Sequence, residues 1–267
     1  MFPKMICPRI AVIILVASFI AGCTSIHNKT TLPATPTIPE TAPILSTITI
    51  IPTPTSPQPT TNSTLSKYAF PASIDPAKEY LFYLHGKIIE DQGLPAVDPS
   101  YGEYEYQAIL EKLSGYGFVV ISEIRPKDPD TWAFAQKIAG QVKTLLKAGV
   151  PPKNIVVVGA SKGAGITILI SQAVQNKDVN YVIMAICDPA TVAEIKKNGV
   201  LLYGNVLSIF DYKDESYGSC RDLFLVSEGK GLSRHDEIVL KVGTGHGVLY
   251  KPLDEWIKPI IQWARQP

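Results

Sequence analysis

Beyond residue 67, short apolar runs alternate with longer segments in which apolar residues recur every three or four positions. Runs such as FVVISEI (118–124) and NIVVVGA (154–160) are rich in β-branched residues, which predicts buried strands. The spacing in 132–148 predicts an amphipathic helix instead. We expect strands at 79–86, 118–124, 154–160, 179–187, 205–210 and 237–242, and helices at 103–117, 132–148, 163–175, 190–198 and 253–264, with a weaker helical segment at 218–228.

This alternation predicts an α/β fold, in which a mostly parallel central sheet lies between two layers of helices. Strands that are apolar on both sides fit a parallel sheet covered on both faces. Only residues 188–204 separate two of the expected strands, which leaves no room there for a large lid. In such folds the chemistry collects at the carboxyl ends of the strands.

The N-terminus has a different pattern. A basic start with Lys4 and Arg9 precedes the apolar run 10–22, as in a secretory signal peptide. The run is shorter than the roughly 20 residues of a membrane-spanning helix. Its end, IAGC at 20–23, resembles the lipobox of bacterial lipoproteins, in which the cysteine receives lipid. That resemblance implies that 1–22 is removed and that Cys23 anchors an exported protein to a membrane of the cell envelope.

The segment 23–66, which starts at Cys23, is dominated by Thr, Pro and Ser. Proline removes backbone donors and fixes φ, so neither helix nor sheet is favoured here. We expect a disordered linker that carries a folded domain at 67–267.

Composition excludes some classes of partner. The chain has 267 residues, a formal net charge of +1 and 18% charged residues, so no strong field points to a nucleic acid. No His/Cys/Asp cluster has the spacing of metal ligands, and GASKGAG lacks both the Walker and the dinucleotide-binding spacings. We expect no metal and no organic cofactor, a small-molecule or acyl substrate, and a monomer.

Four cysteines occur in the chain. Cys7 would leave with the signal peptide, and Cys23 would carry lipid. Cys187 and Cys220 remain, in a compartment that would be oxidising. The sequence leaves open whether they form a disulfide or two buried thiols.

The motif GASKG places Ser161 between Gly159 and Gly163, directly after an expected strand. Such a strand–turn–helix is typical of a nucleophile elbow, whose sharp turn requires small flanking residues. The pentapeptide is weak by itself, because short motifs also match by chance. A serine hydroxyl needs a base to take its proton. The motif therefore indicates a nucleophile only if one of the histidines is placed to act as that base.

His246 lies in the glycine-rich loop GTGHG after the last expected strand, where an imidazole can project over the sheet. We therefore expect His246 to be the general base. His85 is interpreted as a structural part of the turn after the first strand. His235 precedes the last expected strand, at the opposite end of the sheet, and is expected in a solvated loop.

The order serine, acid, histidine resembles the α/β-hydrolase superfamily. The resemblance covers about residues 75–265 and rests on HGK, GASKG, FDYKDE and GTGHG. It implies a triad of Ser161, His246 and an acid after the strand at 205–210, for which the family spacing favours Asp214. The alternatives for the acid are Asp211, Glu215 and Asp188, the last of which would otherwise cap the next helix.

The same resemblance implies an oxyanion hole made by two backbone N–H groups, those of Lys87 in HGK and Lys162 in GASKG. We expect both lysine side chains to be solvated, with recognition of an anionic substrate as the alternative. The segment 86–106 is expected to be irregular. Its side chains either line a substrate groove together with Trp132 or pack against the next helix; these are Glu90, Asp91, Tyr101, Tyr104 and Tyr106.

These features together predict a membrane-anchored serine hydrolase that cleaves an ester or a related acyl bond. The alternatives are a peptidase or acyltransferase with the same triad, and a non-catalytic binding lipoprotein that keeps the fold.

Overall fold

The computed structural model describes residues 65–266. The expected signal peptide 1–22, the lipid site Cys23 and nearly all of the linker 23–66 lie outside the described residues. The description starts at the end of that linker, with the 3-10 helix η1 (Ser66–Tyr68). Within this part of the chain, no helix combines the length and the apolar character needed to cross a membrane.

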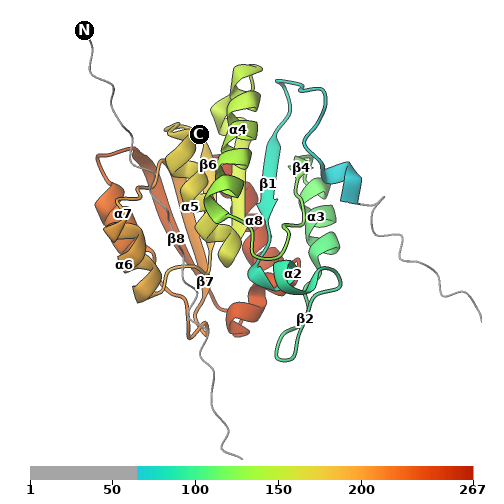
Figure 1. Cartoon of the computed structure of the whole chain (residues 1–267), viewed down its shortest axis with the longest axis vertical. Coiled ribbons are helices and arrows are strands. Elements are labelled where there is room, and N and C mark those ends of the chain that lie inside the picture. The colour runs from blue at the N-terminus through green and yellow to red at the C-terminus, as the bar shows by residue number, and fades with distance from the viewer. Residues whose placement is uncertain (1–64, 267) are drawn as a thin grey trace, which may run out of the picture. The chain divides into compact units, whose positions relative to one another are not determined.

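Six parallel strands form the central sheet, in the order β4-β1-β5-β6-β7-β8 (Figure 1). The order places β1 between β4 and β5, so the chain changes direction across the sheet after β4. In open α/β sheets ligands bind at such a switch point, outside the carboxyl ends of the strands. The strands are β1 (Tyr80–Leu84), β4 (Val119–Ile121), β5 (Ile155–Ala160), β6 (Asn180–Met184), β7 (Gly204–Asp211) and β8 (Leu232–Leu240).

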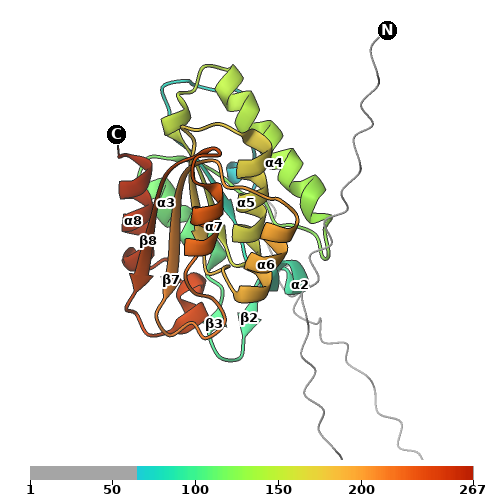
Figure 2. The same cartoon turned by 90° about the vertical axis from the view of Figure 1, so that its left-hand side faces the viewer.

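Helices cover both faces of the sheet, which confirms the predicted three-layer α/β fold (Figures 1 and 2). One face is covered by α3 (Tyr106–Gly115) and α8 (Asp254–Ala264), together with the 3-10 helix η3 (Gly245–Tyr250). The other face is covered by α4 (Thr131–Lys147), α5 (Lys162–Val174), α6 (Pro189–Lys197) and α7 (Arg221–Ser227).

The alternation of side chains along β1 shows why its sequence is apolar throughout. Leu81 and Tyr83 belong to the core beneath α3 and α8, whereas Tyr80, Phe82 and Leu84 belong to the core beneath α4 and α5. Successive residues of a strand point to opposite faces. A strand that is covered on both faces therefore needs an apolar residue at every position.

β8 begins at Leu232, earlier than the predicted start at 237, so the expectation that His235 lies in a loop is wrong. His235 lies within the strand, with its imidazole stacked on Phe224 at 4.5 Å and 3.1 Å from the carboxylate of Glu228. β8 is the last strand of the sheet order, and an edge strand can carry polar residues. Because the first residues of β8 are polar, the hydrophobic pattern did not predict that part of the strand.

The segment expected to be irregular contains short regular elements. α2 (Lys87–Gln92) follows β1, and an antiparallel hairpin of β2 (Val97–Asp98) and β3 (Gly102–Glu103) follows α2. The link between β6 and β7 holds α6, with no large lid, as predicted.

Candidate active site

Ser161 occupies a strained turn between β5 and α5. Its φ of 52° and ψ of −121° are uncommon for a residue with a side chain. The turn is held on both sides, because the Ser161 N–H donates to the Met184 carbonyl at 2.9 Å and the Ser161 carbonyl accepts from Ala164 N–H at 2.8 Å. This is the geometry predicted for a nucleophile elbow.

The flanking glycines are required by packing. A β-carbon on Gly159 would overlap the backbone carbonyl of Gly163, and one on Gly163 would overlap the carbonyl of Leu84 at the end of β1. The turn after β5 thus lies directly against the end of the neighbouring strand. Backbone contact this close leaves space for no side chain at either position.

His246 lies in η3, after β8, and its Nδ1 is 2.8 Å from Oδ2 of Asp214. A carboxylate can only accept, so Nδ1 carries a proton, and in the neutral imidazole this makes Nε2 the acceptor. The side chain of Asp214 is 2% exposed and that of His246 is 19% exposed. The Tyr217 ring packs against the imidazole at a centroid distance of 5.0 Å. The pair is thus largely shielded, while part of the imidazole stays accessible.

The pKa of Asp214 reflects two opposing effects. Burial raises it, but the hydrogen bond and charge of His246, with the backbone N–H groups of Ser216 and Tyr217, lower it by more. The pKa of Asp214 therefore lies below its ordinary value, and the carboxyl group is ionised at neutral pH.

The alternative acids have other partners. Asp211 is fully buried at the end of β7 and accepts four backbone hydrogen bonds, from Lys213, Val242, Gly243 and Gly245. Three of these donors belong to the loop that leads from β8 to His246, so Asp211 fixes that loop. Asp188 caps α6 by accepting from the N–H groups of Ala190 and Thr191, as the sequence allowed. Glu215 is exposed.

Ser161, Asp214 and His246 each follow a different strand: β5, β7 and β8. Because all six strands are parallel, their carboxyl ends lie along the same side of the sheet. Ser161, Asp214 and His246 therefore all lie at the carboxyl ends of the strands.

The two lysines predicted to supply backbone donors begin two helices beside Ser161. Lys87 is the first residue of α2, and Lys162 is the first residue of α5. A β-carbon on Gly86 would lie 3.6 Å from Cβ of Ser161, which places the start of α2 next to the serine. The first N–H groups of a helix have no acceptor within the helix, so the Lys87 and Lys162 N–H groups are oriented by their own helices and can donate to a bound molecule.

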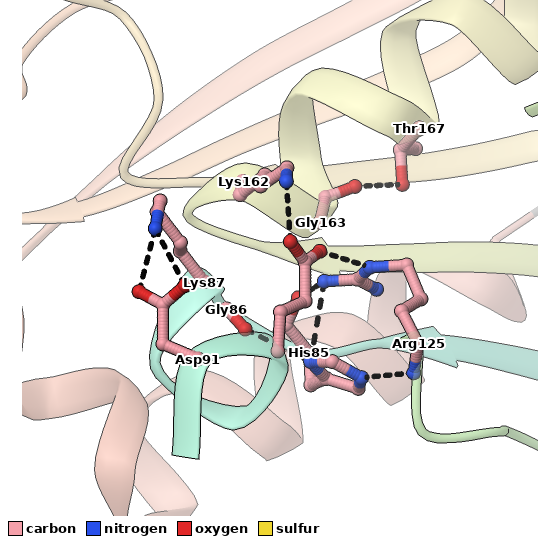
Figure 3. Close-up of polar contacts among 9 residues, drawn as sticks. His85, Gly86, Lys87, Asp91, Arg125, Lys162, Gly163 and Thr167 are labelled. Carbon is pink, nitrogen blue, oxygen red and sulfur yellow. Dashed lines mark hydrogen bonds and ion pairs between the residues drawn. The ribbon is translucent and has the colours of Figure 1, made fainter. Parts of the chain in front are cut away.

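A buried ion-pair network supports these two helix starts (Figure 3). Glu90 of α2 pairs with the Lys162 ammonium and, at 2.5 Å, with Arg125 Nε. The Glu90 and Arg125 side chains are 1% and 0% exposed. Arg125 also donates from Nη2 to the carbonyl of His85. The network therefore ties α2, α5 and the end of β1 together.

Sequence reasoning missed this network, although Arg125 follows a predicted strand and Glu90 follows HGK by three residues. For Lys162 the expectation of a solvated side chain is wrong, because that side chain is 20% exposed and pairs with a buried carboxylate. Lys87 does lie at the surface, where it pairs with Asp91 at 2.7 Å.

His85 is a structural residue of the turn after β1, as predicted. Its imidazole is fully buried, and Nε2 accepts the Arg125 backbone N–H at 3.0 Å, so Nδ1 carries the proton and donates to the Gly86 carbonyl at 2.8 Å. Burial and the charges of Arg125 and Lys162 lower the pKa of His85 to about 3, against the opposing Gly86 hydrogen bond. His85 is therefore neutral at physiological pH.

For the aromatic residues of 86–106, the structure supports packing at two positions, and the groove-lining interpretation stays a prediction. Tyr104 and Tyr106 are buried, with their hydroxyls bonded to Tyr83 at 2.7 Å and Ser122 at 2.6 Å, so they pack the segment onto the domain. Tyr101 is 38% exposed. Trp132, at the start of α4, is 37% exposed.

Cys187 and Cys220 form a disulfide that joins the segment after β6 to the start of α7. The Gly218 N–H donates to the Cys187 carbonyl at 2.8 Å and adds a second link. The loop that carries Asp214 lies between β7 and Cys220, so these links restrain it. A hollow of about 870 Å³ lies beside this loop and α6, and its walls include Asp214, Tyr217, Asp188, Val192 and Lys196.

Over residues 65–266 there is no group of three or more His, Cys, Asp or Glu side chains arranged to hold a metal ion.

No family model and no curated protein matches the chain. Solved structures similar to it include SOBER1 of Arabidopsis thaliana, at 12% identity and a TM-score of 0.46 over 71% of this chain and 98% of that one. An esterase/lipase from an uncultured bacterium has 14% identity and a TM-score of 0.42, over 70% and 78%. A lipase-esterase related protein of Clostridium acetobutylicum has 13% and 0.40, over 71% and 96%. Because these identities and TM-scores are low, the function is inferred from the chain's own geometry and not from these structures.

Proposed function

We propose that this protein is a serine hydrolase that cleaves an ester or a related acyl bond. The observation that carries the proposal is the His246–Asp214 hydrogen bond at the sheet edge where Ser161 sits in a strained elbow. Ser161 is the nucleophile, His246 the general base, and Asp214 the residue that orients the imidazole. This is the division of labour in a Ser-His-Asp triad.

In the first step, Nε2 of His246 takes the proton of the Ser161 hydroxyl as Oγ attacks the carbonyl carbon. The carbonyl π electrons move onto oxygen, and the backbone N–H groups of Lys87 and Lys162 stabilise that oxyanion. Collapse expels the alkoxide, which takes the proton from His246. Water then attacks the acyl carbon while His246 takes one of its protons. Collapse of the second tetrahedral intermediate breaks the bond to Oγ, which takes that proton back from His246 as the carboxylic acid leaves. Loss of one oxyanion donor costs about 2.7–4 kcal/mol in such sites.

The hollow beside Asp214 is proposed to hold part of the substrate, because it adjoins the loop of the triad acid. Its walls carry both apolar and charged groups, which suits an ester with a polar portion. The Tyr217 ring, which packs on His246, is part of this wall.

We further propose that the hydrolase is exported and held at a membrane of the cell envelope through lipid on Cys23, with 23–66 as a spacer. The lipobox-like IAGC motif supports this proposal. Labelled palmitate should enter the wild type but not Cys23→Ala. A wild type that takes up no palmitate would rule out the anchor.

The hydrolase proposal is tested with a fluorophosphonate probe, which reacts with an activated serine. The wild type should be labelled and should hydrolyse p-nitrophenyl esters, whereas Ser161→Ala should do neither at unchanged thermal stability. Ser233→Ala, which removes an exposed serine of β8 outside the walls of the hollow beside Asp214, should behave as wild type. No labelling of the folded wild type would favour the non-catalytic binding lipoprotein. Labelling combined with cleavage of peptides but not of esters would favour a peptidase.

A further inference from the structure

A second cavity, of about 300 Å³, lies against β4, the edge strand at the other end of the sheet order from β8. Its walls come from η1 and the residues that follow it, from β1, from the end of β4 and from α4. Most of the walls are apolar, for instance Phe82, Leu84, Ile121 and Ile138. The volume lies at the lower end of the range for small-molecule sites.

Three wall residues carry a buried polar atom that has no hydrogen-bond partner within residues 65–266. These atoms are Nη1 of Arg125, the hydroxyl of Tyr68 and Oε1 of Gln141. Arg125 is 1% exposed and Tyr68 is 3% exposed. Buried polar atoms in native proteins are almost always bonded, because desolvation without a partner is costly. Three such atoms around one cavity are available to hydrogen-bond a molecule that enters it.

The guanidinium of Arg125 is held so that one nitrogen remains unused. Nε donates to Glu90, and Nη2 donates to the His85 carbonyl. The ring of Phe134, another wall residue, lies 5.6 Å from the guanidinium carbon. Arg125 is therefore fixed before any ligand arrives, and Nη1 is its available donor.

The charges around the cavity favour an anion. Glu90 is shared between Arg125 and Lys162, so one negative charge faces two positive charges. Glu123 also lines the cavity, but its carboxylate pairs with Lys137 at 2.6 Å. One positive charge in excess, next to a mostly apolar chamber, suits a ligand with one negative charge and an apolar body.

We propose that this cavity binds a small carboxylic acid with an apolar body. Its carboxylate accepts hydrogen bonds from Nη1 of Arg125 and from the Tyr68 hydroxyl, while its body lies against the apolar walls. A hydroxyl on the body gains an acceptor in Oε1 of Gln141. Ser161 is not among the walls of this cavity, and the proposal stands whether or not the protein is a hydrolase.

The test uses ¹⁹F NMR of 4-fluorobenzoate with the full-length chain, with 4-fluorobenzyl alcohol as the neutral ligand. We expect saturable broadening with the acid, and binding of the alcohol at least about tenfold weaker, because the alcohol lacks the charge. The Ser161→Ala variant should bind the acid as wild type does, which separates this site from the proposed active site.

Tyr68→Phe is the decisive variant, because it removes only the hydroxyl. That hydroxyl makes no hydrogen bond of normal geometry in the described part of the chain, and its nearby charge is the Lys67 ammonium, whose pKa it raises. The melting temperature should therefore change little, while the affinity for the acid should fall about tenfold. Tyr203 lies outside the cavity walls, so Tyr203→Phe should leave the affinity for the acid unchanged. Equal binding of acid and alcohol, no saturable binding, or unchanged affinity in Tyr68→Phe would each overturn the proposal.

Discussion

His246 donates from Nδ1 to Oδ2 of Asp214 over 2.8 Å, although 32 positions separate the two residues in the chain. Asp211 lies three residues before Asp214 and has a different role, since its side chain accepts from four backbone N–H groups. One carboxylate therefore orients the imidazole, and the other shapes the loop that presents it.

These different roles of Asp214 and Asp211 predict different effects of the same Asp→Asn substitution. Asp214→Asn should lower kcat for an activated ester by roughly 10³–10⁴-fold, because the amide no longer selects the Nδ1–H tautomer. The loss in its free energy of unfolding at neutral pH should be smaller than the loss in transition-state stabilisation that this fall in kcat represents. Asp211→Asn should destabilise the fold by about 1–3 kcal/mol, since a buried acceptor of four N–H groups is weakened. Ester kinetics and urea unfolding of both variants measure this, and the reverse ranking of kcat would exchange the two roles.

The packing of the elbow predicts a sharp difference between two glycines of α5. Gly163→Ala should destabilise the domain by about 3 kcal/mol or more, because its β-carbon would overlap the Leu84 carbonyl. Gly165→Ala is the matched control. There the β-carbon would lie 3.6 Å from Cδ1 of Ile186, an ordinary contact, and helix propensity favours alanine by about 0.5–1 kcal/mol. Chemical unfolding of the two variants decides, and equal stabilities would contradict the close approach.

The Glu90 network predicts that one buried carboxylate matters far more than its exposed neighbour. Glu90→Gln should cost about 3–5 kcal/mol, because Arg125 and Lys162 would lose their shared counter-charge. It should also lower kcat, since α2 and α5 carry the proposed oxyanion donors. Asp91→Asn breaks only the surface pair with Lys87 and should cost at most about 0.5 kcal/mol. Comparable losses in the two variants would refute the supporting role of the network.

The lowered pKa of His85 predicts a loss of stability in mild acid. Between pH 6.5 and about 3 the unfolded chain binds a proton at this imidazole, whereas the folded chain does not. Unfolding then takes up a proton, so the free energy of unfolding decreases as pH falls from 6.5, by about 2 kcal/mol at pH 5. The contribution is fully present above pH 6.5.

The measurement is urea unfolding of wild type and His85→Gln from pH 8 to pH 5. The glutamine side chain cannot titrate. The free energy of unfolding of His85→Gln should therefore fall less steeply than that of the wild type between pH 8 and pH 5, whatever its value at pH 8. Parallel curves for the two proteins would show that His85 is not the group responsible.

The fold was predictable because its strands are buried on both faces, so β1, β5 and β6 stand out as apolar runs. The start of β8 was hidden by the polar residues that an edge strand tolerates. The motifs around Ser161 and His246 were visible because backbone geometry demands glycine beside them. The ion pairs of Glu90 were invisible, since Arg125 and Lys162 are 35 and 72 positions away and no local pattern encodes such a contact.

The bond between Cys187 and Cys220 closes a covalent ring that contains β7 and Asp214. A protease that cut one peptide bond in the exposed stretch around Glu215 would open the main chain there without releasing either piece. The two halves would stay joined through sulfur, with the carboxylate partner of His246 still attached. Survival of a single nick in this stretch is thus a direct benefit of this cross-link.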